Sequence, residues 1–391
     1  MFKKIYKMGE QEIYKTYKEE CRKKHELRDL FWETTLTCNL KCKHCGSNAE
    51  GRKYEGELTT EEIKTAFKQI AGDMDASQIL INVTGGEPLM RRDLFEVMEY
   101  ATNELGFHWG MTSNGMLLND ENIEKLKKAN MSTIAISIDG LEETHDEFRG
   151  VPGSYKIITG NIKKMMASKY FDHVQVTTVF HKKNIDQLDR LYDVMQDLGV
   201  DSWRIASMDP IGRATENDEL LLDGNDLKKL LDFVKSKRKH GKLKVLYSCQ
   251  GYLGLEYERE VRKNYFQCRA GISIASILYN GDLSVCPDVP RLPHLIQGNI
   301  RTDNFKDVWE NKYQVYRDKN RTSCEECNKC KNWEYCLGGA FHTWNFEENK
   351  QNRCAYKMIF EDKKWKVEGY ESIKENKIWI NNVWNDINDA S

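Results

Sequence analysis

The sequence lacks the features that mark several classes of protein. Its 59 basic and 61 acidic residues nearly cancel, so no bulk positive field favours nucleic acid or anionic lipid as a partner. No run of 18 apolar residues is present, and the N-terminal stretch MFKKIYKMGEQEIYKTYKEE lacks the apolar core of a signal peptide. There is also no internal repeat or low-complexity segment. We therefore expect a cytoplasmic protein that binds neither nucleic acid nor a membrane.

Cysteine, by contrast, is abundant and clustered. A reducing compartment makes structural disulfides rare, so the 12 cysteines need another explanation. One group is Cys38, Cys42 and Cys45; a second is Cys324, Cys327, Cys330 and Cys336, flanked by Cys268, Cys286 and Cys354; Cys21 and Cys249 stand apart. Gaps of two to five residues between such cysteines are typical of metal ligands, and a disulfide framework is the less favoured alternative.

Between residues 30 and 240, short apolar runs alternate with helical patterns. Strands are predicted at 30–36, 78–83, 107–112, 132–138, 173–180 and 202–206. The first intervening helix carries Ile63, Phe67 and Ile70 at helical spacing, and it begins with the capping box Thr59-x-x-Glu62. Six βα units in series predict parallel strands, but six are too few for the usual eight-stranded barrel. We therefore expect an α/β fold, a partial (β/α)6 TIM-like barrel, with ligands at the carboxyl ends of its strands.

The pattern changes after about residue 240. Residues 276–286 predict a β-hairpin, with Asn280-Gly281 suited to a type I′ turn. A short helical stretch at 305–313, the dense cysteine region and an aromatic-rich tail follow. We expect an N-terminal helical extension (1–29), the partial barrel (30–240), a smaller cysteine-rich domain held together by metal (241–357) and a C-terminal tail (358–391).

The first cysteine group, CNLKCKHC, follows the first predicted strand with the spacing C-x3-C-x2-C. An iron–sulfur cubane usually has four thiolate ligands, so three would leave one iron open to another molecule. Tetrahedral zinc is the competing interpretation, because His44 lies inside the motif and could complete a Cys3His site. Spacing alone leaves both possibilities open.

Further motifs follow this loop in order along the predicted βα units. They are TGGEP (84–88), TSNG (112–115), SIDG (137–140), HDEFRG (145–150) and PIGRA (210–214). Together with C-x3-C-x2-C, this ordered set resembles the radical S-adenosylmethionine (SAM) enzymes over roughly residues 30–215. The resemblance implies that Cys38, Cys42 and Cys45 hold a 4Fe–4S cluster whose open iron binds SAM. An electron from the cluster then cleaves SAM to methionine and a 5′-deoxyadenosyl radical that abstracts hydrogen from substrate.

The resemblance also implies which residues contact SAM. By position these are Gly85, Gly86, Glu87, Ser113, Asn114, Ser137, Arg149 and His44. The two glycines would let the backbone approach SAM closely because they lack a Cβ atom, and Glu87 is the nearby acid. Arg149 suits a carboxylate, and His44 would lie against the adenine. Asp139 is expected to shape its loop instead of moving protons.

The second cysteine group resembles the SPASM extension of peptide-modifying radical SAM enzymes, over about residues 249–357. That family binds two auxiliary 4Fe–4S clusters there. By position, Cys327, Cys330, Cys336 and Cys354 would hold one completely, while Cys268 and Cys286 belong to the other. The family usually has a further cysteine where this chain has Ala340. We expect Cys324, Cys249 or His342 to replace it, with Cys324 favoured; an open, absent or zinc-containing site is the alternative.

These resemblances predict an enzyme that modifies a ribosomally made peptide or protein and receives electrons from a flavodoxin- or ferredoxin-type donor. Alternatives are a sulfatase-maturating, formylglycine-forming enzyme and a radical SAM enzyme of tetrapyrrole or other cofactor synthesis. A non-enzymatic iron–sulfur electron carrier is a further class, but such a carrier has no use for the SAM-associated motifs. About 30 residues precede the first predicted strand. We therefore expect a peptide to be recognised by the core, the N-terminal helix or a separate partner.

Overall fold

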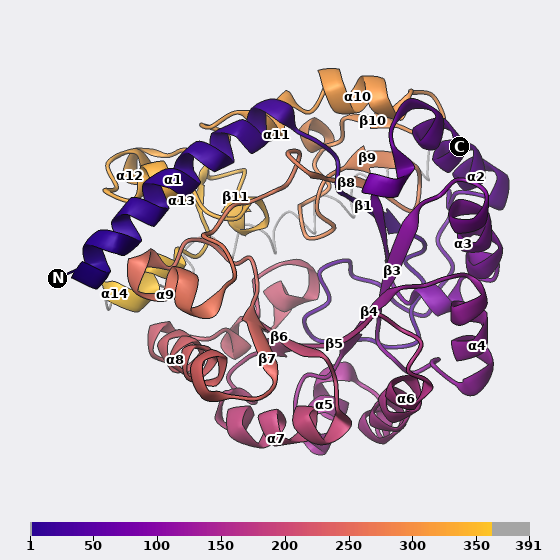
Figure 1. The fold of residues 1–391 in the computed structure, drawn as a ribbon, viewed down its shortest axis with the longest axis horizontal. Helices are drawn as coiled ribbons and strands as arrows, with labels where there is room; N and C mark the ends of the chain where they lie inside the picture. The colour runs from indigo at the N-terminus through magenta and orange to yellow at the C-terminus, as the bar shows by residue number, and fades with distance from the viewer. Residues whose placement is uncertain (1, 362–391) are drawn as a thin grey trace, which may run out of the picture.

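A long, mainly parallel sheet forms the centre of the molecule (Figure 1). The computed structural model describes residues 2–361, with side chains from residue 7 onward. The strands are β1 (Asp29–Glu33), β2 (Leu80–Thr84), β3 (His108–Ser113), β4 (Thr133–Ser137), β5 (His173–Phe180), β6 (Ser202–Ser207), β7 (Lys244–Tyr247), β8 (Ile274–Ile277), β9 (Asp282–Ser284) and β10 (Gly298–Asn299). A separate two-stranded sheet pairs β11 (Trp344–Asn345) with β12 (Lys350–Gln351). The six predicted strands are confirmed as β1–β6.

The helices of the described residues are α1 (Phe2–Lys24), α2 (Thr60–Asp73), α3 (Leu94–Asn103), α4 (Asp120–Lys128), α5 (Glu142–Arg149), α6 (Ser154–Ser168), α7 (Leu188–Leu198), α8 (Gly224–His240), α9 (Gly254–Val261), α10 (Phe305–Asn311), α11 (Gln314–Arg317), α12 (Glu325–Asn328), α13 (Trp333–Cys336) and α14 (Ala355–Phe360). Of these, α2, α3, α4, α6, α7 and α8 alternate with the parallel strands and lie around the outer side of the sheet (Figure 1). The capping box at Thr59 and Glu62 is confirmed at the start of α2. Ile63, Phe67 and Ile70 are buried as their spacing predicted.

The sheet is an open, partial barrel. Its strand order is β10-β9-β8-β1-β2-β3-β4-β5-β6-β7, so β10 and β7 are its edges among the described residues. Two parallel strands lie beyond the predicted six: β7 pairs with β6, and β8 pairs with β1 in the register Asp29↔Ile274. The parallel sheet therefore draws strands from both sides of residue 240, and the domain boundary proposed there does not separate two sheets.

The β8–β9 hairpin is confirmed, but its predicted type I′ turn is wrong. A type I′ turn needs positive φ at both central residues. Here the backbone N–H of Gly281 donates to the carbonyl of Leu278 (2.9 Å), and only Gly281 has positive φ (+88°). This three-residue loop ends in a left-handed glycine, which lets Asn280 keep an ordinary backbone conformation.

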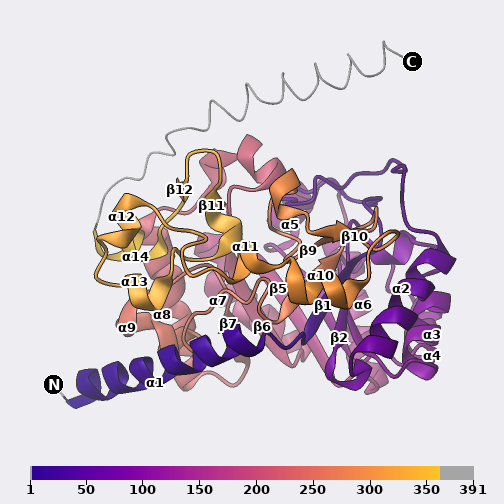
Figure 2. The same ribbon diagram turned by 90° about the horizontal axis from the view of Figure 1, so that it is seen from above.

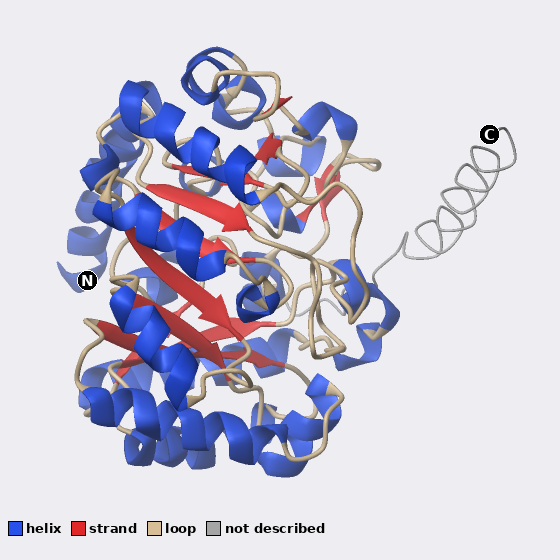
Figure 3. Cartoon of the chain, turned by 90° about the vertical axis from the view of Figure 1, so that its right-hand side faces the viewer, coloured by secondary structure: helices blue, strands red, loops and turns tan. Residues whose placement is uncertain are grey.

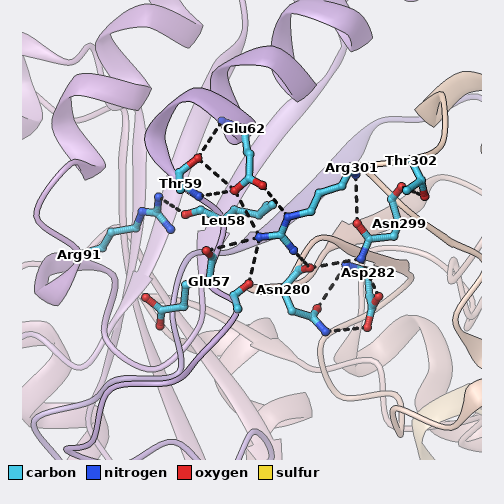
Figure 4. Close-up of polar contacts among 11 residues, drawn as sticks. Glu57, Leu58, Thr59, Glu62, Arg91, Asn280, Asp282, Asn299, Arg301 and Thr302 are labelled. Atoms are coloured by element: carbon cyan, nitrogen blue, oxygen red, sulfur yellow. Dashed lines mark hydrogen bonds and ion pairs between the residues drawn. The ribbon is translucent and has the colours of Figure 1, made fainter.

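The C-terminal region packs against the barrel in two places. On one side, α14 contacts α8, and α1 contacts α9 and α13 (Figure 2). On the other, Arg301 joins the hairpin to the start of α2 (Figure 4). Its guanidinium donates to the Glu62 carboxylate (2.6 Å) and to the backbone carbonyls of Asn280 (2.6 Å) and Gly56 (3.1 Å). Nearby, Arg91 donates to the carbonyl of Leu58 (2.8 Å).

The carboxyl ends of the parallel strands face the loop-rich side of the molecule (Figure 3). The loop between β1 and α2, which carries the first cysteine group, begins there. Of the predicted C-terminal tail, residues 362–391 lie outside the described residues.

Candidate active site

The loop after β1 brings Cys38, Cys42 and Cys45 to one wall of a cavity of about 350 Å³. Hydrogen bonds fix the backbone of this loop. The Cys38 N–H donates to the carbonyl of Glu50 (3.0 Å). Arg213, from the segment after β6, donates to the carbonyl of Cys42 (2.9 Å). These contacts present three thiols of the C-x3-C-x2-C motif toward one space.

Gly85 and Gly86 line the same cavity, but the structure gives a different reason for them. A Cβ atom on Gly85 would lie 2.3 Å from the carbonyl oxygen of Thr35, and one on Gly86 would lie 2.3 Å from that of Thr37. The Gly86 N–H donates to the Thr35 carbonyl (2.7 Å). The glycines are therefore required for close packing against the chain leaving β1, and not only for access to SAM.

Glu87 is fully buried and is absent from the cavity lining. Its carboxylate accepts hydrogen bonds from the Ser113 hydroxyl (2.9 Å) and the Asn114 backbone N–H (2.8 Å). Burial raises its pKa to about 7, against the lowering effect of these hydrogen bonds. The structure thus places Glu87 behind the wall, where it fixes the turn after β3.

Ser113 and Ser137 are the last residues of β3 and β4, Asn114 follows β3, and all three line the cavity. The Asn114 side-chain amide donates to the Asn39 side-chain oxygen (2.7 Å) and lies 3.8 Å from the Cys38 sulfur. The end of β3 is therefore tied directly to the cysteine loop.

Arg149 lines the cavity but already has a carboxylate partner. Its Nε and Nη2 atoms lie 2.6 Å and 2.5 Å from Oδ2 of Asp139, and Nη1 lies 3.5 Å from the Cys42 sulfur. Burial alone would raise the pKa of Asp139, but Arg149 holds it at about 2. Asp139 also accepts from the Val179 N–H (2.8 Å), which confirms its expected part in shaping the loop. A SAM carboxylate that pairs with Arg149, as predicted, would share the guanidinium with Asp139.

His44 stacks on Phe148, with ring centroids 4.6 Å apart, and also lines the cavity. Burial lowers the pKa of His44 to about 3, so the imidazole is neutral. Its Nδ1 atom is buried and has no hydrogen-bond partner within residues 2–361. A ligand in the cavity could complete this bonding.

The four cysteines predicted to form one auxiliary cluster lie together. Burial raises the pKa of the Cys336 thiol, and the neighbouring Cys354, Cys327 and Cys330 raise it further. The Cys324 sulfur accepts from the Cys327 N–H (3.4 Å), so Cys324 belongs to this group.

The structure does not bring Cys324, the favoured replacement for the missing ligand, to the cavity of the other candidates, so that replacement stays a prediction. A second cavity, of about 430 Å³, is lined by Cys249, Cys268, Cys286, Ala340 and His342, and Cys324 is absent from its lining. Spacing favoured Cys324 because it is close to Cys327 in sequence. In the structure, Cys324 accordingly lies beside Cys327.

Several cavity residues were missed from the sequence. Asp209 and Arg204 both lie on or just after β6, and both line the first cavity. Asp288, two residues after Cys286, does so too. The signal for Asp209 was its place at the carboxyl end of a predicted strand; nothing in the sequence distinguished Arg204 or Asp288 from solvated surface charges.

The donors fit the implied cofactors. Three thiols and a neutral imidazole face one cavity, and four thiols gather at a second place, which matches the preference of iron–sulfur clusters for thiolate ligands. Family comparisons agree: the model of the radical SAM superfamily matches residues 32–195, and that of the SPASM iron–sulfur cluster-binding domain matches residues 268–331. The chain is a radical SAM enzyme with a C-terminal SPASM-type domain. Its cofactors are SAM and 4Fe–4S clusters.

Curated relatives of this radical SAM enzyme carry different names. The AdoMet-dependent heme synthase of Methanosarcina barkeri is 29% identical over 329 residues, covering 80% of this chain and 90% of the relative. The mycofactocin maturase MftC of Mycobacterium tuberculosis is 28% identical, covering 79% and 77%. The enzyme is thus similar both to a protein named a heme synthase and to one named a maturase.

Solved structures share the fold. Streptococcus suis SuiB bound to S-adenosylmethionine has a TM-score of 0.67 at 20% identity, covering 86% of this chain and 79% of SuiB. The anSMEcpe structure with AdoMet and the Kp18Cys peptide has a TM-score of 0.66 at 17% identity, covering 91% and 99%. Within the described residues, no helix is both long and apolar enough to cross a membrane.

Proposed function

We propose that this enzyme abstracts hydrogen from a residue of a ribosomally made peptide or protein and thereby installs a post-translational modification. A crosslink, a thioether, an epimer or an oxidised side chain would each follow from such a step. The observation that carries the proposal is the composition of the first cavity. Its wall combines the three cysteines of the radical SAM loop with Cys249, Asp288 and His342, which the sequence analysis assigned to the auxiliary domain.

The relatives support the proposal in part. MftC is named a maturase, and a second SuiB structure, with a TM-score of 0.64 at 21% identity, is described as bound to its precursor peptide SuiA. A tetrapyrrole remains the alternative substrate class, because relatives at 29% identity are named heme synthases.

The residues around the cavity have definable roles in this proposal. When bound, SAM and its cluster supply a 5′-deoxyadenosyl radical. Arg149 and Arg213 hold the loop that carries the three thiols, through Cys42. Ser137 and Asn114 present polar groups from the strand ends, where they would orient SAM. The neutral imidazole of His44 would lie against the adenine without adding charge.

Electrons are proposed to come from a flavodoxin- or ferredoxin-type protein, since SAM cleavage consumes one electron from outside the chain. The cytoplasm is the proposed compartment. All twelve cysteines are unpaired, and thiol ligands need a reducing environment to stay available to iron.

The proposal is tested with enzyme reconstituted anaerobically with iron and sulfide. It is incubated with SAM, a low-potential reductant and short peptides encoded beside its gene, and products are followed by mass spectrometry. We expect 5′-deoxyadenosine together with a mass change in one peptide. The Cys21→Ala variant is the matched control, because Cys21 lies on α1 and is absent from the lining of both cavities.

The same assay separates the two substrate classes. Turnover of a carboxylated iron porphyrin, with no change in any peptide, would refute peptide modification while leaving the radical SAM assignment intact. Formation of 5′-deoxyadenosine that only a peptide stimulates would support the proposal.

A further inference from the structure

The second cavity contains an incomplete set of thiols. Cys249 follows β7, Cys268 precedes β8, and Cys286 follows β9, and all three line this cavity of about 430 Å³. Ala340 lies among them and is 1% exposed, so its methyl group faces the cavity where related domains usually carry a cysteine. Three thiols from separate segments thus converge beside an alanine.

His342 lies two residues beyond Ala340 and lines both cavities. It is buried, and one of its ring nitrogens lies within 4.8 Å of the Cys286 sulfur and of an Asp288 carboxylate oxygen. Its Nε2 atom is 3.4 Å from Oδ2 of Asp209. Asp209 is fixed in turn by the side-chain amide of Gln250 (2.6 Å).

This arrangement is typical of a metal-binding histidine. Such histidines usually donate one ring N–H to a carboxylate, which fixes the ring and leaves the other nitrogen to the metal. With Nε2 directed to Asp209, Nδ1 of His342 is the nitrogen available to a cluster. No similar support exists for Cys324, which is beside Cys327.

We propose that the auxiliary site nearest the radical SAM loop is an iron–sulfur cluster held by Cys249, Cys268, Cys286 and His342. Asp209 positions the imidazole and is not itself a ligand. As a cluster ligand, an imidazole is a neutral donor, whereas a thiolate is anionic. Replacing thiolate by imidazole raises the reduction potential of a cluster, as in Rieske centres. The substitution at Ala340 would therefore make this cluster a better electron acceptor than one with four thiolates.

The proposal is independent of the substrate, so its test needs none. A background variant carries Cys38→Ala, Cys42→Ala and Cys45→Ala, which leaves only auxiliary iron. After anaerobic reconstitution we expect about eight irons and about eight acid-labile sulfides per chain, that is, two cubanes. Adding Cys249→Ala or Cys268→Ala should remove about four of each, whereas Cys21→Ala, the matched control on α1, should remove none.

The histidine is tested spectroscopically. Pulsed electron paramagnetic resonance of the reduced background variant should show nitrogen hyperfine coupling on one cluster. His342→Cys should keep the iron count, abolish that coupling and lower the midpoint potential of one cluster only. Because the new cysteine can itself bind iron, this variant should keep both its cluster and its fold. Far-ultraviolet circular dichroism checks the fold.

Three results would overturn the proposal. The first is full retention of iron and sulfide in both Cys249→Ala and Cys268→Ala. The second is an unchanged spectrum and potential in His342→Cys. The third is about one zinc or iron per chain without extra sulfide, which would indicate a single ion bound by Cys286, Asp288 and His342. None of these results bears on whether a peptide is the substrate.

Discussion

At the scale of single residues, the buried pair of Asp139 and Arg149 holds the wall of the first cavity. Asp139 is 0% exposed, and Arg149 also reaches the Cys42 sulfur at 3.5 Å. The pair links the end of β4 to the cysteine loop, so its geometry and the position of one expected iron ligand are coupled.

Asp139→Asn should therefore be strongly destabilising. Leaving one member of a buried ion pair without its partner's charge costs about 3–5 kcal/mol. We expect a lower midpoint of urea unfolding and a reduced iron content at the radical SAM site. Glu147→Gln is the control, because Glu147 lies on the same helix as Arg149 but forms exposed ion pairs with Lys43 and Lys183. Equal unfolding midpoints for the two variants would contradict this account.

Gly86→Ala should disrupt the cavity wall through the backbone. The added methyl group would lie 2.3 Å from the Thr37 carbonyl oxygen, and the strand end must shift to relieve the clash. Forced overpacking of this kind costs about 1–3 kcal/mol. Thermal unfolding measures the loss.

Gly160→Ala is the matched change, because Gly160 lies in α6 with nothing within 4 Å of its added Cβ. That variant should be stabilised by about 0.5–1 kcal/mol. A Gly86→Ala protein as stable as the wild type would show that the strand end adjusts freely.

At the scale of secondary-structure elements, the sequence predicted most of the fold. Short apolar runs identified β1–β6, and helical apolar spacing identified the buried face of α2, since the helical spacing follows directly from backbone geometry. The two added strands were harder, because nothing local in the sequence shows that β7 joins the parallel sheet or that β8 pairs with β1.

The sequence predicts the site residues that lie in motifs, but not those that long-range packing brings to the cavity. The cavity contains Cys38, Cys42 and Cys45, as their spacing suggested. In contrast, the partners of Glu87 and Cys249 depend on which strand ends meet, which sequence spacing does not encode. The expectation for Cys324 has the same basis, because it rested on nearness along the chain, which does not fix nearness in space.

The contact between Arg301 and α2 is the clearest test at this scale. Arg301 joins Glu62 to the hairpin turn (Figure 4), and its hydrogen bonds, with that of the Thr59 N–H, hold the pKa of Glu62 at about 2. The contribution of a carboxylate with a lowered pKa is complete above its unfolded value and is lost only as the pH falls toward its folded value.

Arg301→Ala should accordingly loosen the hairpin to the same extent at about pH 6 and about pH 8, because Glu62 stays charged throughout this range. Hydrogen exchange of residues 278–303 gives the readout. Lys64→Ala, which removes a contact from α2 to Glu96, is the control and should leave the hairpin unchanged. Equal exchange in the two variants would show that Arg301 does not hold the hairpin to α2.

At the scale of the whole molecule, two regions of the chain line one cavity. The carboxyl-end loops of the barrel hold the radical SAM cysteines, and the C-terminal region closes the same cavity with Asp288 and His342. Substrate is expected to enter between them, so that one bound molecule meets both regions.

The most direct test of the central claim is 5′-deoxyadenosine formation by the variant with alanine at positions 38, 42 and 45. With SAM and a low-potential reductant under anaerobic conditions, we expect this variant to form none while keeping its auxiliary iron. The Cys21→Ala control should form 5′-deoxyadenosine at the wild-type rate. Continued SAM cleavage by the triple variant would contradict the assignment of Cys38, Cys42 and Cys45 as the ligands of the SAM-binding cluster.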